Sequence, residues 1–250
     1  MHVTVTVIAH NARSHVAACL RSIQGQTYED WDAVVVDDGS RDGTGEIVRS
    51  IAETDPRIAL LSNPECLGRP KSRNQSWRAA KGPLIAILDS DDTSYPDRLE
   101  KQVAFLQSHP AIDVLGSGVE LVDSRCAFQG IRLLPEHHEQ LVQNVYRSNP
   151  FANPSVMIRR NVLEQLGGYD EQFQRSQDYE LWIRASTEFK FHNLQEPLVR
   201  YRIRKKTPIS ASLFCCYAIL KGAWHQSVLH KRWWYAARPL VAACLERVRG

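Results

Sequence analysis

The chain has 250 residues, enough for one large domain or two small ones, and its 43% hydrophobic and 24% charged content is ordinary for a globular protein. No apolar run approaches the roughly 20 residues of a membrane span, and a strand pattern begins at Val3, so we expect neither a transmembrane helix nor a secretion signal. The six cysteines are scattered without a Cys-x-x-Cys pair, which indicates reduced thiols in a cytoplasmic protein and neither a disulfide framework nor a zinc site.

Strand and helix patterns alternate through the first 110 residues. Short β-branched or apolar runs predict strands, and apolar residues at helical spacing predict helices. We expect strands at 3–9, 31–36, 57–61 and 84–88, and helices at 14–24, 44–53, 73–80 and 96–107. Ser14 is the expected N-cap of the first helix, and Gly82 the expected C-terminal cap of the third. This alternation predicts an α/β fold with a mostly parallel central sheet flanked by helices.

The pattern changes after about residue 112. We expect strands at 114–122 and 155–158, and helices at 161–166 and 177–186. No internal repeat or low-complexity linker interrupts the chain. The sequence therefore predicts one domain over 1–205, with a nucleotide-binding half (1–110) and an acceptor-side half (111–205), followed by a basic, aromatic, helical tail over 206–250.

The net charge of +3 conceals an asymmetry. Eleven Lys and Arg but a single acid, Glu246, lie between Val199 and Gly250, whereas the preceding residues hold twenty bases and twenty-seven acids. Such a tail suits peripheral contact with an anionic membrane at its inner surface, with its Trp residues at the headgroups. Equally, its Trp residues would pack on the domain and leave the cations solvated. If the tail folds back, His225 or His230 would reach a metal. We expect no nucleic-acid partner.

The segment Leu84-Ile85-Ala86-Ile87-Leu88-Asp89-Ser90-Asp91-Asp92 is the most informative in the chain. Its apolar run reads as a strand buried on both faces, and the acids follow at the strand end, where open α/β sheets bind ligands. Three like charges this close repel one another unless a cation lies among them, and a divalent ion shared with phosphate oxygens would do this. The alternative is a solvated acidic turn before a helix.

Three further segments combine charged residues with turns. Asp37-Asp38-Gly39-Ser40 follows the second strand, where a carboxylate would accept hydrogen bonds from a nucleobase or ribose or would only shape the turn. The loop Gly68-Arg69-Pro70-Lys71-Ser72-Arg73-Asn74 would hold a pyrophosphate or remain a solvated basic loop. Asp178, near the start of a helix, is either a helix cap or a general base.

Taken in order, these segments resemble the family 2 glycosyltransferases of the GT-A (Rossmann-like) fold. The resemblance covers roughly residues 1–205 and rests on Val3-Thr4-Val5-Thr6-Val7-Ile8-Ala9-His10-Asn11, Val36-Asp37-Asp38-Gly39-Ser40, Arg73-Asn74, Leu88-Asp89-Ser90-Asp91-Asp92 with Pro96-Asp97-Arg98-Leu99, and Gly167-Gly168-Tyr169-Asp170 with Gln177-Asp178-Tyr179-Glu180-Leu181-Trp182-Ile183-Arg184. It implies an inverting, metal-dependent hexosyl transfer from a nucleoside diphosphate sugar, most commonly a UDP-sugar, to a glycan or lipid-linked acceptor in cell-surface polysaccharide synthesis.

The resemblance also assigns roles to residues. Asp38 would meet the nucleobase, with Ala9 and Asn11 nearby, and Arg73, Asp89 and Ser90 would complete the nucleotide-sugar site. Asp91 and Asp89 would form the Asp-x-Asp pair that holds Mn²⁺ or Mg²⁺, with Asp91 the more direct ligand. Asp178 would be the catalytic base, Glu180 a structural residue, and 149–155 either part of the acceptor wall or an ordinary Pro-rich connection.

Two departures from the family pattern bear on the site. The first loop, commonly Pro-Thr-Tyr-Asn, here reads Ala9-His10-Asn11, so the usual aromatic residue beside the base is missing. The acid commonly found before the catalytic base is here Gln177. Two other functions stay open at this point: a nucleotidyltransferase, which would be expected to have a Gly-rich loop after the first strand, and an inactive nucleotide-sugar-binding protein.

Overall fold

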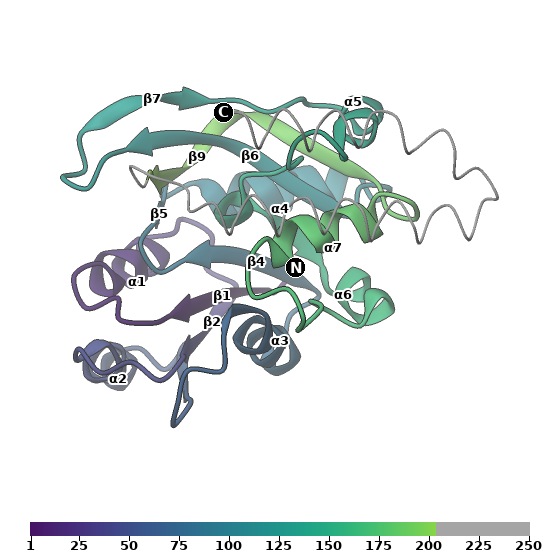
Figure 1. The fold of residues 1–250 in the computed structure, drawn as a ribbon. Coiled ribbons are helices and arrows are strands. Elements are labelled where there is room, and N and C mark those ends of the chain that lie inside the picture. The colour runs from purple at the N-terminus through teal and green to yellow at the C-terminus, as the bar shows by residue number, and fades with distance from the viewer. Residues whose placement is uncertain (204–250) are drawn as a thin grey trace, which may run out of the picture.

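The computed structural model describes residues 1–203, which form one continuous sheet with helices packed on it (Figure 1). The strands are β1 (Val3–Ala9), β2 (Trp31–Asp37), β3 (Ile58–Ser62), β4 (Leu84–Asp89), β5 (Thr93–Ser94), β6 (Val114–Val122), β7 (Phe128–Arg132), β8 (Met157–Arg159) and β9 (Phe191–Arg202). The helices are α1 (Val16–Gln24), α2 (Thr44–Thr54), α3 (Arg69–Ala79), α4 (Arg98–Ser108), α5 (His138–Asn144), α6 (Arg160–Leu166), α7 (Gln177–Ala185) and the 3₁₀ turn η1 (Asn153–Ser155).

The sheet order aligns the ends of the strands that carry the acidic motifs. Strands run in the order β3-β2-β1-β4-β8-β6-β9-β5, with β7 paired to β6, and the first four are mutually parallel. In the register, Ala9 lies opposite Asp37 and Ile8 lies opposite Asp89. The carboxyl ends of β1, β2 and β4 therefore meet at one edge, as open α/β sheets require of a ligand site.

Alternate side chains of each strand supply two apolar layers. On one face, Val3, Val5 and Val7 of β1 pack in the layer that contains the buried residues of α1, α2 and α4. On the other face, Ile85 and Ile87 of β4 pack in the layer that contains the buried residues of α3, α6 and α7. Each fully buried Val, Leu or Ile stabilises the fold by about 1.5–3 kcal/mol, so both faces of the central strands hold helices in place.

The second half of the chain extends the same sheet. β8 pairs antiparallel with β4, and β9 pairs in parallel with β6 over most of its length. At the end of β9 the backbone N–H of Arg202 donates to Asp92 Oδ1 at 2.7 Å, so the last described strand returns to the acidic turn after β4. The predicted α/β class with a mostly parallel sheet is confirmed.

Several expected boundaries were wrong. α1 begins at Val16, with His15 as its N-cap and no side-chain cap, so Ser14 does not have that role. α3 begins at Arg69 and not Arg73, because Gly68 with φ 91° turns the chain directly into the helix. That helix ends at Ala79, so Gly82 does not cap it.

The start of α4 also differs from the prediction. The backbone N–H of Arg98 donates to Tyr95 O, which makes Pro96 part of a turn that precedes the helix. Thr93 and Ser94, which precede this turn, pair with β9 as the short strand β5.

Four elements after residue 111 were not predicted: β7, α5, η1 and β9. The tail predicted over 206–250, with its Trp residues, His225 and His230, lies outside the described residues. Within residues 1–203, no helix combines the length and apolar character needed to cross a bilayer. The described cysteines Cys19, Cys66 and Cys126 are free thiols.

Candidate functional site

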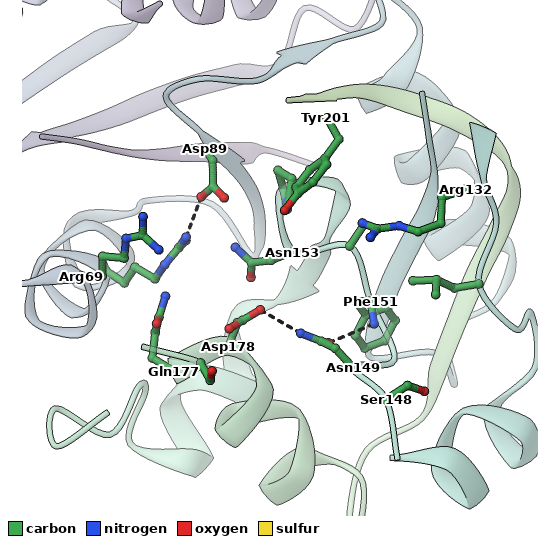
Figure 2. Close-up of a pocket in the computed structure, with 15 residues that line it drawn as sticks. Arg69, Asp89, Arg132, Ser148, Asn149, Phe151, Asn153, Gln177, Asp178 and Tyr201 are labelled. Carbon is green, nitrogen blue, oxygen red and sulfur yellow. Dashed lines mark hydrogen bonds and ion pairs between the residues drawn. The ribbon is translucent and has the colours of Figure 1, made fainter. Parts of the chain in front are cut away.

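A cavity of about 410 Å³ lies between the acidic edge of the sheet and helix α7 (Figure 2). The first half of the chain lines it with Arg69, Arg73 and Asp89. The second half supplies Arg132 from β7, Asn149 and Asn153 from the segment before β8, Gln177 and Asp178 from α7, and Tyr201 from β9. Residues far apart in the sequence thus face one space that combines two carboxylates with three guanidinium groups.

An ion pair between Arg73 and Asp89 forms one wall of the cavity. Nη2 of Arg73, on α3, lies 2.6 Å from Oδ1 of Asp89, at the end of β4. Burial alone would lower the pKa of the Arg73 guanidinium, but the charges of Asp89 and Asp178 and the hydrogen bond to Asp89 outweigh burial and hold that pKa above its usual value. The guanidinium is therefore a fixed positive charge in the cavity.

The loop after β2 is organised around the buried Asp38 carboxylate. Its Oδ1 accepts hydrogen bonds from Asn63 Nδ2 at 3.0 Å and from Leu67 N at 2.9 Å, and its Oδ2 accepts from Gly68 N at 3.0 Å. Burial opposes ionisation, but the hydrogen bonds from Leu67, Asn63 and neighbouring groups lower the pKa of Asp38 below its usual value. Asp38 thereby fixes the chain that leads into α3, a structural task that the motif alone did not indicate.

The loop after β1 is fastened to the loop after β2. The backbone N–H of Asn11, at φ 49°, donates to Ser40 Oγ at 2.9 Å, and Asn11 Oδ1 accepts from Arg41 N at 3.0 Å. Ala9 is fully buried, and its carbonyl accepts from Asp38 N at 2.8 Å. Ala9, Asn11 and Asp38 thus come together in one cluster, and none of the three lines the cavity.

Negative charge is concentrated in the turn after β4. Burial, together with the charges of Asp89 and Asp91, raises the pKa of Asp92 to about 9. The backbone carbonyl of Asp91 accepts from Arg202 Nε at 3.1 Å, which fixes the turn from the side of β9. Asp89, Ser90 and Asp91 therefore stand on a rigid turn in a field that favours a cation.

Asp178, the second residue of α7, faces the cavity from the opposite side (Figure 2). Its Oδ2 accepts a hydrogen bond from Asn149 Nδ2 at 2.9 Å. The neighbouring Glu180 points elsewhere and forms an ion pair with Arg184 at 2.7 Å. Arg184 also donates to the carbonyls of Leu166 and Gly168, which agrees with a structural role for Glu180.

Three residues that line this cavity each have one buried polar atom without a hydrogen-bond partner within residues 1–203: Arg73 Nε, Asn153 Oδ1 and Gln177 Oε1. One is a donor and two are acceptors. A buried polar group without a partner costs about 1–3 kcal/mol, so these three residues carry an energetic cost close to the cavity.

The residues present fit a divalent cation. Hard cations such as Mg²⁺ are held by one or two carboxylates, with the remaining positions taken by phosphate oxygens and water. Asp91 and the Asp89 oxygen that does not contact Arg73 offer such ligands. Within residues 1–203 no cluster of three or more His, Cys, Asp or Glu side chains could hold a metal ion without further ligands.

Sequence reasoning missed several residues of the cavity wall. Arg132 and Tyr201 lie on strands that were not predicted, with the Arg132 guanidinium 5.1 Å from the centre of the Tyr201 ring. Arg69 was read as part of a loop but belongs to the first turn of α3. Segment 149–155 was left open between acceptor wall and simple connection; it lines the cavity.

Comparisons with known proteins agree with this geometry. The glycosyl transferase family 2 model matches residues 4–167. The O-antigen biosynthesis glycosyltransferase WbnJ of Escherichia coli is 28% identical over 218 residues, 84% of this chain and 83% of its own length.

Two similar structures extend the comparison to the fold. Staphylococcus aureus TarS 1–349 in complex with UDP-GlcNAc has a TM-score of 0.77 at 20% identity, over 99% of this chain and 72% of that one. Mannosyltransferase PcManGT of Pyrobaculum calidifontis, in complex with GDP-Man and Mn²⁺, has a TM-score of 0.67 at 20% identity, over 97% and 73%. With the family model spanning more than half of its length, the chain belongs to glycosyl transferase family 2 and has the GT-A fold.

Proposed function

We propose that this glycosyltransferase moves a sugar from a nucleoside diphosphate sugar, most simply a UDP-sugar, to a hydroxyl group of a glycan or lipid-linked acceptor in polysaccharide synthesis, with inversion at the anomeric carbon. The observation that carries the proposal is the cavity between Asp89 and Asp178, which combines these two carboxylates with three guanidinium groups. The wall that carries Asp89 suits the donor, and the wall that carries Asp178 suits the acceptor.

On the donor side, the loop cluster of Ala9, Asn11 and Asp38 would receive the nucleoside. Arg73 would present its fixed charge beside Asp89, and Ser90 would border the diphosphate. A Mn²⁺ or Mg²⁺ ion, held by Asp91 and Asp89, would neutralise the charge that develops on the diphosphate. The relatives support this assignment, since TarS has been seen with UDP-GlcNAc and PcManGT with GDP-Man and Mn²⁺.

On the acceptor side, Asp178 would act as the general base. Its carboxylate takes the proton from the acceptor hydroxyl as that oxygen forms a bond to the anomeric carbon. The bond between this carbon and the diphosphate oxygen breaks on the opposite face, and the diphosphate leaves with the electron pair. One displacement inverts the configuration. General-base catalysis of this kind typically contributes about 10²–10⁴-fold to the rate.

The place of the reaction is a further part of the proposal. WbnJ acts in O-antigen biosynthesis, which supports a polysaccharide role. Lipid-linked acceptors lie at a membrane, and the excess of Lys and Arg from Val199 onward supports peripheral contact with anionic lipid. Co-sedimentation of the full chain with anionic vesicles, compared with zwitterionic ones, tests that contact, and equal recovery with both would refute it.

A nucleotide-sugar panel tests the enzyme. The full chain is incubated with UDP-, GDP- and TDP-sugars, with and without Mn²⁺, and the release of nucleoside diphosphate is measured. Slow release to water from one donor supports the transferase. In a parallel incubation with nucleoside triphosphates and a sugar 1-phosphate, release of pyrophosphate would instead indicate the nucleotidyltransferase. A thermal shift without turnover would indicate an inactive binding protein.

A further inference from the structure

The carboxylate of Asp178 is held by a neutral side chain, Asn149, through the 2.9 Å hydrogen bond to Oδ2 (Figure 2). Asn149 stands 29 residues earlier in the chain, in the segment that leads to η1. Its backbone continues into Pro150 and Phe151, both buried. The contact therefore joins α7 to a separate part of the acceptor-side half.

The orientation of the Asn149 amide is fixed by its second hydrogen bond. The backbone N–H of Phe151 donates to Asn149 Oδ1 at 3.2 Å. A backbone N–H can only donate, so the atom that faces it must be the amide oxygen, and the amide nitrogen must face Asp178. One side chain thus connects a rigid backbone donor to one particular oxygen of the carboxylate.

The segment that carries Asn149 is held from behind. The fully buried Asn193 of β9 donates from Nδ2 to Pro150 O at 3.0 Å and to Pro135 O at 2.9 Å. The Phe151 ring packs edge-on against Trp182 of α7 with ring centres 5.2 Å apart. Helix and segment are therefore packed together, and the Asn149 amide has little freedom to move away from Asp178.

We propose that Asn149 is a positioning residue for Asp178, an inference that rests on the proposed function. By occupying Oδ2, the Asn149 amide turns the carboxylate so that Oδ1 faces the acceptor hydroxyl. A base must lie within about 2.6–3.2 Å of the proton that it removes, and a misplacement of 1 Å costs about 10²-fold in rate. Asn149 serves catalysis through Asp178 and need not touch the substrate.

If Asn149 had only a structural role, its substitutions would affect the rate differently. If Asn149 served only to accept the N–H of Phe151, any side chain that kept that acceptor would suffice. Asn149→Asp keeps the shape and an oxygen for Phe151, but it replaces the donor that faces Asp178 with a second carboxylate. The substitution therefore separates the two roles, whereas Asn149→Ala removes both hydrogen bonds at once.

The first experiment measures turnover of the donor that the panel identifies, with water in place of the acceptor. We expect Asn149→Asp and Asn149→Ala to lower kcat by about 10²-fold, with the donor KM changed less than about twofold. Asn144→Asp is the matched control, because Asn144 donates only to the Gln140 carbonyl at the surface of α5. Wild-type kcat for Asn149→Asp, at unchanged thermal stability, would overturn the proposal.

The second experiment combines substitutions. In the Asp178→Asn background, adding Asn149→Ala should lower kcat no further, because a residue that acts only through Asp178 has nothing left to position. Multiplied losses would assign Asn149 an independent role and refute the inference. If Asp178→Asn itself keeps the wild-type rate, or if the wild type consumes no donor, the proposed function fails first, and the two failures are thereby distinguished.

Discussion

The Arg73 guanidinium lies 2.6 Å from the Asp89 carboxylate, and this pair connects α3 to the end of β4 at the wall of the cavity. Arg73 is almost completely buried, whereas Asp89 remains one-third exposed. One carboxylate oxygen is therefore committed to the protein, and the other remains available to a ligand. The pair both supports the fold and sets the charge of the site.

We expect Arg73→Met to lower the free energy of unfolding by about 1.5–3 kcal/mol, the usual value of a hydrogen bond to a charged group. Chemical denaturation at pH 7 measures the loss. Arg78→Met on the same helix is the control, because Arg78 is exposed and only stacks over Trp77, at 5.3 Å, a contact of about 0.5–1 kcal/mol. Equal losses in the two variants would show that the Arg73 ion pair contributes little.

Asp178→Asn should reduce donor turnover by about 10²–10⁴-fold, because an amide cannot take the proton from the attacking hydroxyl. Donor affinity, measured by isothermal titration calorimetry with Mn²⁺, should stay at the wild-type value, since Asp178 lies on the acceptor side. A variant that turns over donor at the wild-type rate would remove Asp178 from the mechanism.

Asp91→Asn tests the metal. The variant should bind donor no better with Mn²⁺ than with EDTA, whereas the wild type should lose affinity when EDTA is added, because the cation bridges carboxylate and diphosphate. Asp97→Asn is the matched control, since Asp97 pairs with Lys101 at 2.8 Å in an exposed position. Metal-dependent binding that survives Asp91→Asn would refute the assignment.

The pKa of Asp38 gives a prediction about acid stability. Because hydrogen bonds lower the folded-state pKa of Asp38 below its unfolded value, ionised Asp38 stabilises the fold above about pH 4. That contribution is lost as the pH falls through the folded-state pKa. Asp38→Asn should therefore be less stable than wild type at pH 7, and the difference should narrow toward pH 2. Urea titrations across this range measure it, and a constant difference would contradict the prediction.

Two adjacent glycines offer a matched pair for stability. Gly167 and Gly168 both adopt positive φ, at 71° and 81°. A Cβ on Gly167 would meet nothing within 4 Å, whereas one on Gly168 would lie 2.5 Å from Asn74 Oδ1. We expect Gly167→Ala to cost about 1–2 kcal/mol, from backbone strain alone, and Gly168→Ala to cost about 1–3 kcal/mol more. Thermal denaturation compares them, and equal costs would contradict the close approach.

Residues 1–110 were the more predictable part of the fold. Strands β1, β2 and β4 are rich in β-branched and apolar residues and are mostly buried on both faces, so the sequence predicts them clearly. The motifs also predicted that Asp89 lies at the end of a strand and Asp178 near the start of a helix. Both residues line one cavity. The start of α3 was missed because Arg69, Pro70 and Lys71 show no apolar periodicity. In the structure, Gly68 turns the chain into the helix, and its backbone N–H donates to Asp38.

The acceptor-side half was harder to predict for a physical reason. β9 contains Asn193, Gln195 and Pro197, which argue locally against a strand, and tertiary pairing with β6 overrides that preference. The buried Asn193 amide donates to the carbonyls of Pro135 and Pro150. These partners are distant in the sequence and come together only in the folded structure. The wall residues Arg132 and Tyr201 could not be found without these strands.

Strand β9 begins at Phe191, in the apolar layer that also contains residues of α7, and finishes at Arg202, whose backbone N–H donates to Asp92. A single strand therefore connects the packing of α7 with the acidic turn after β4. A substitution that disturbs the pairing of β9 with β6 should consequently affect both walls of the cavity.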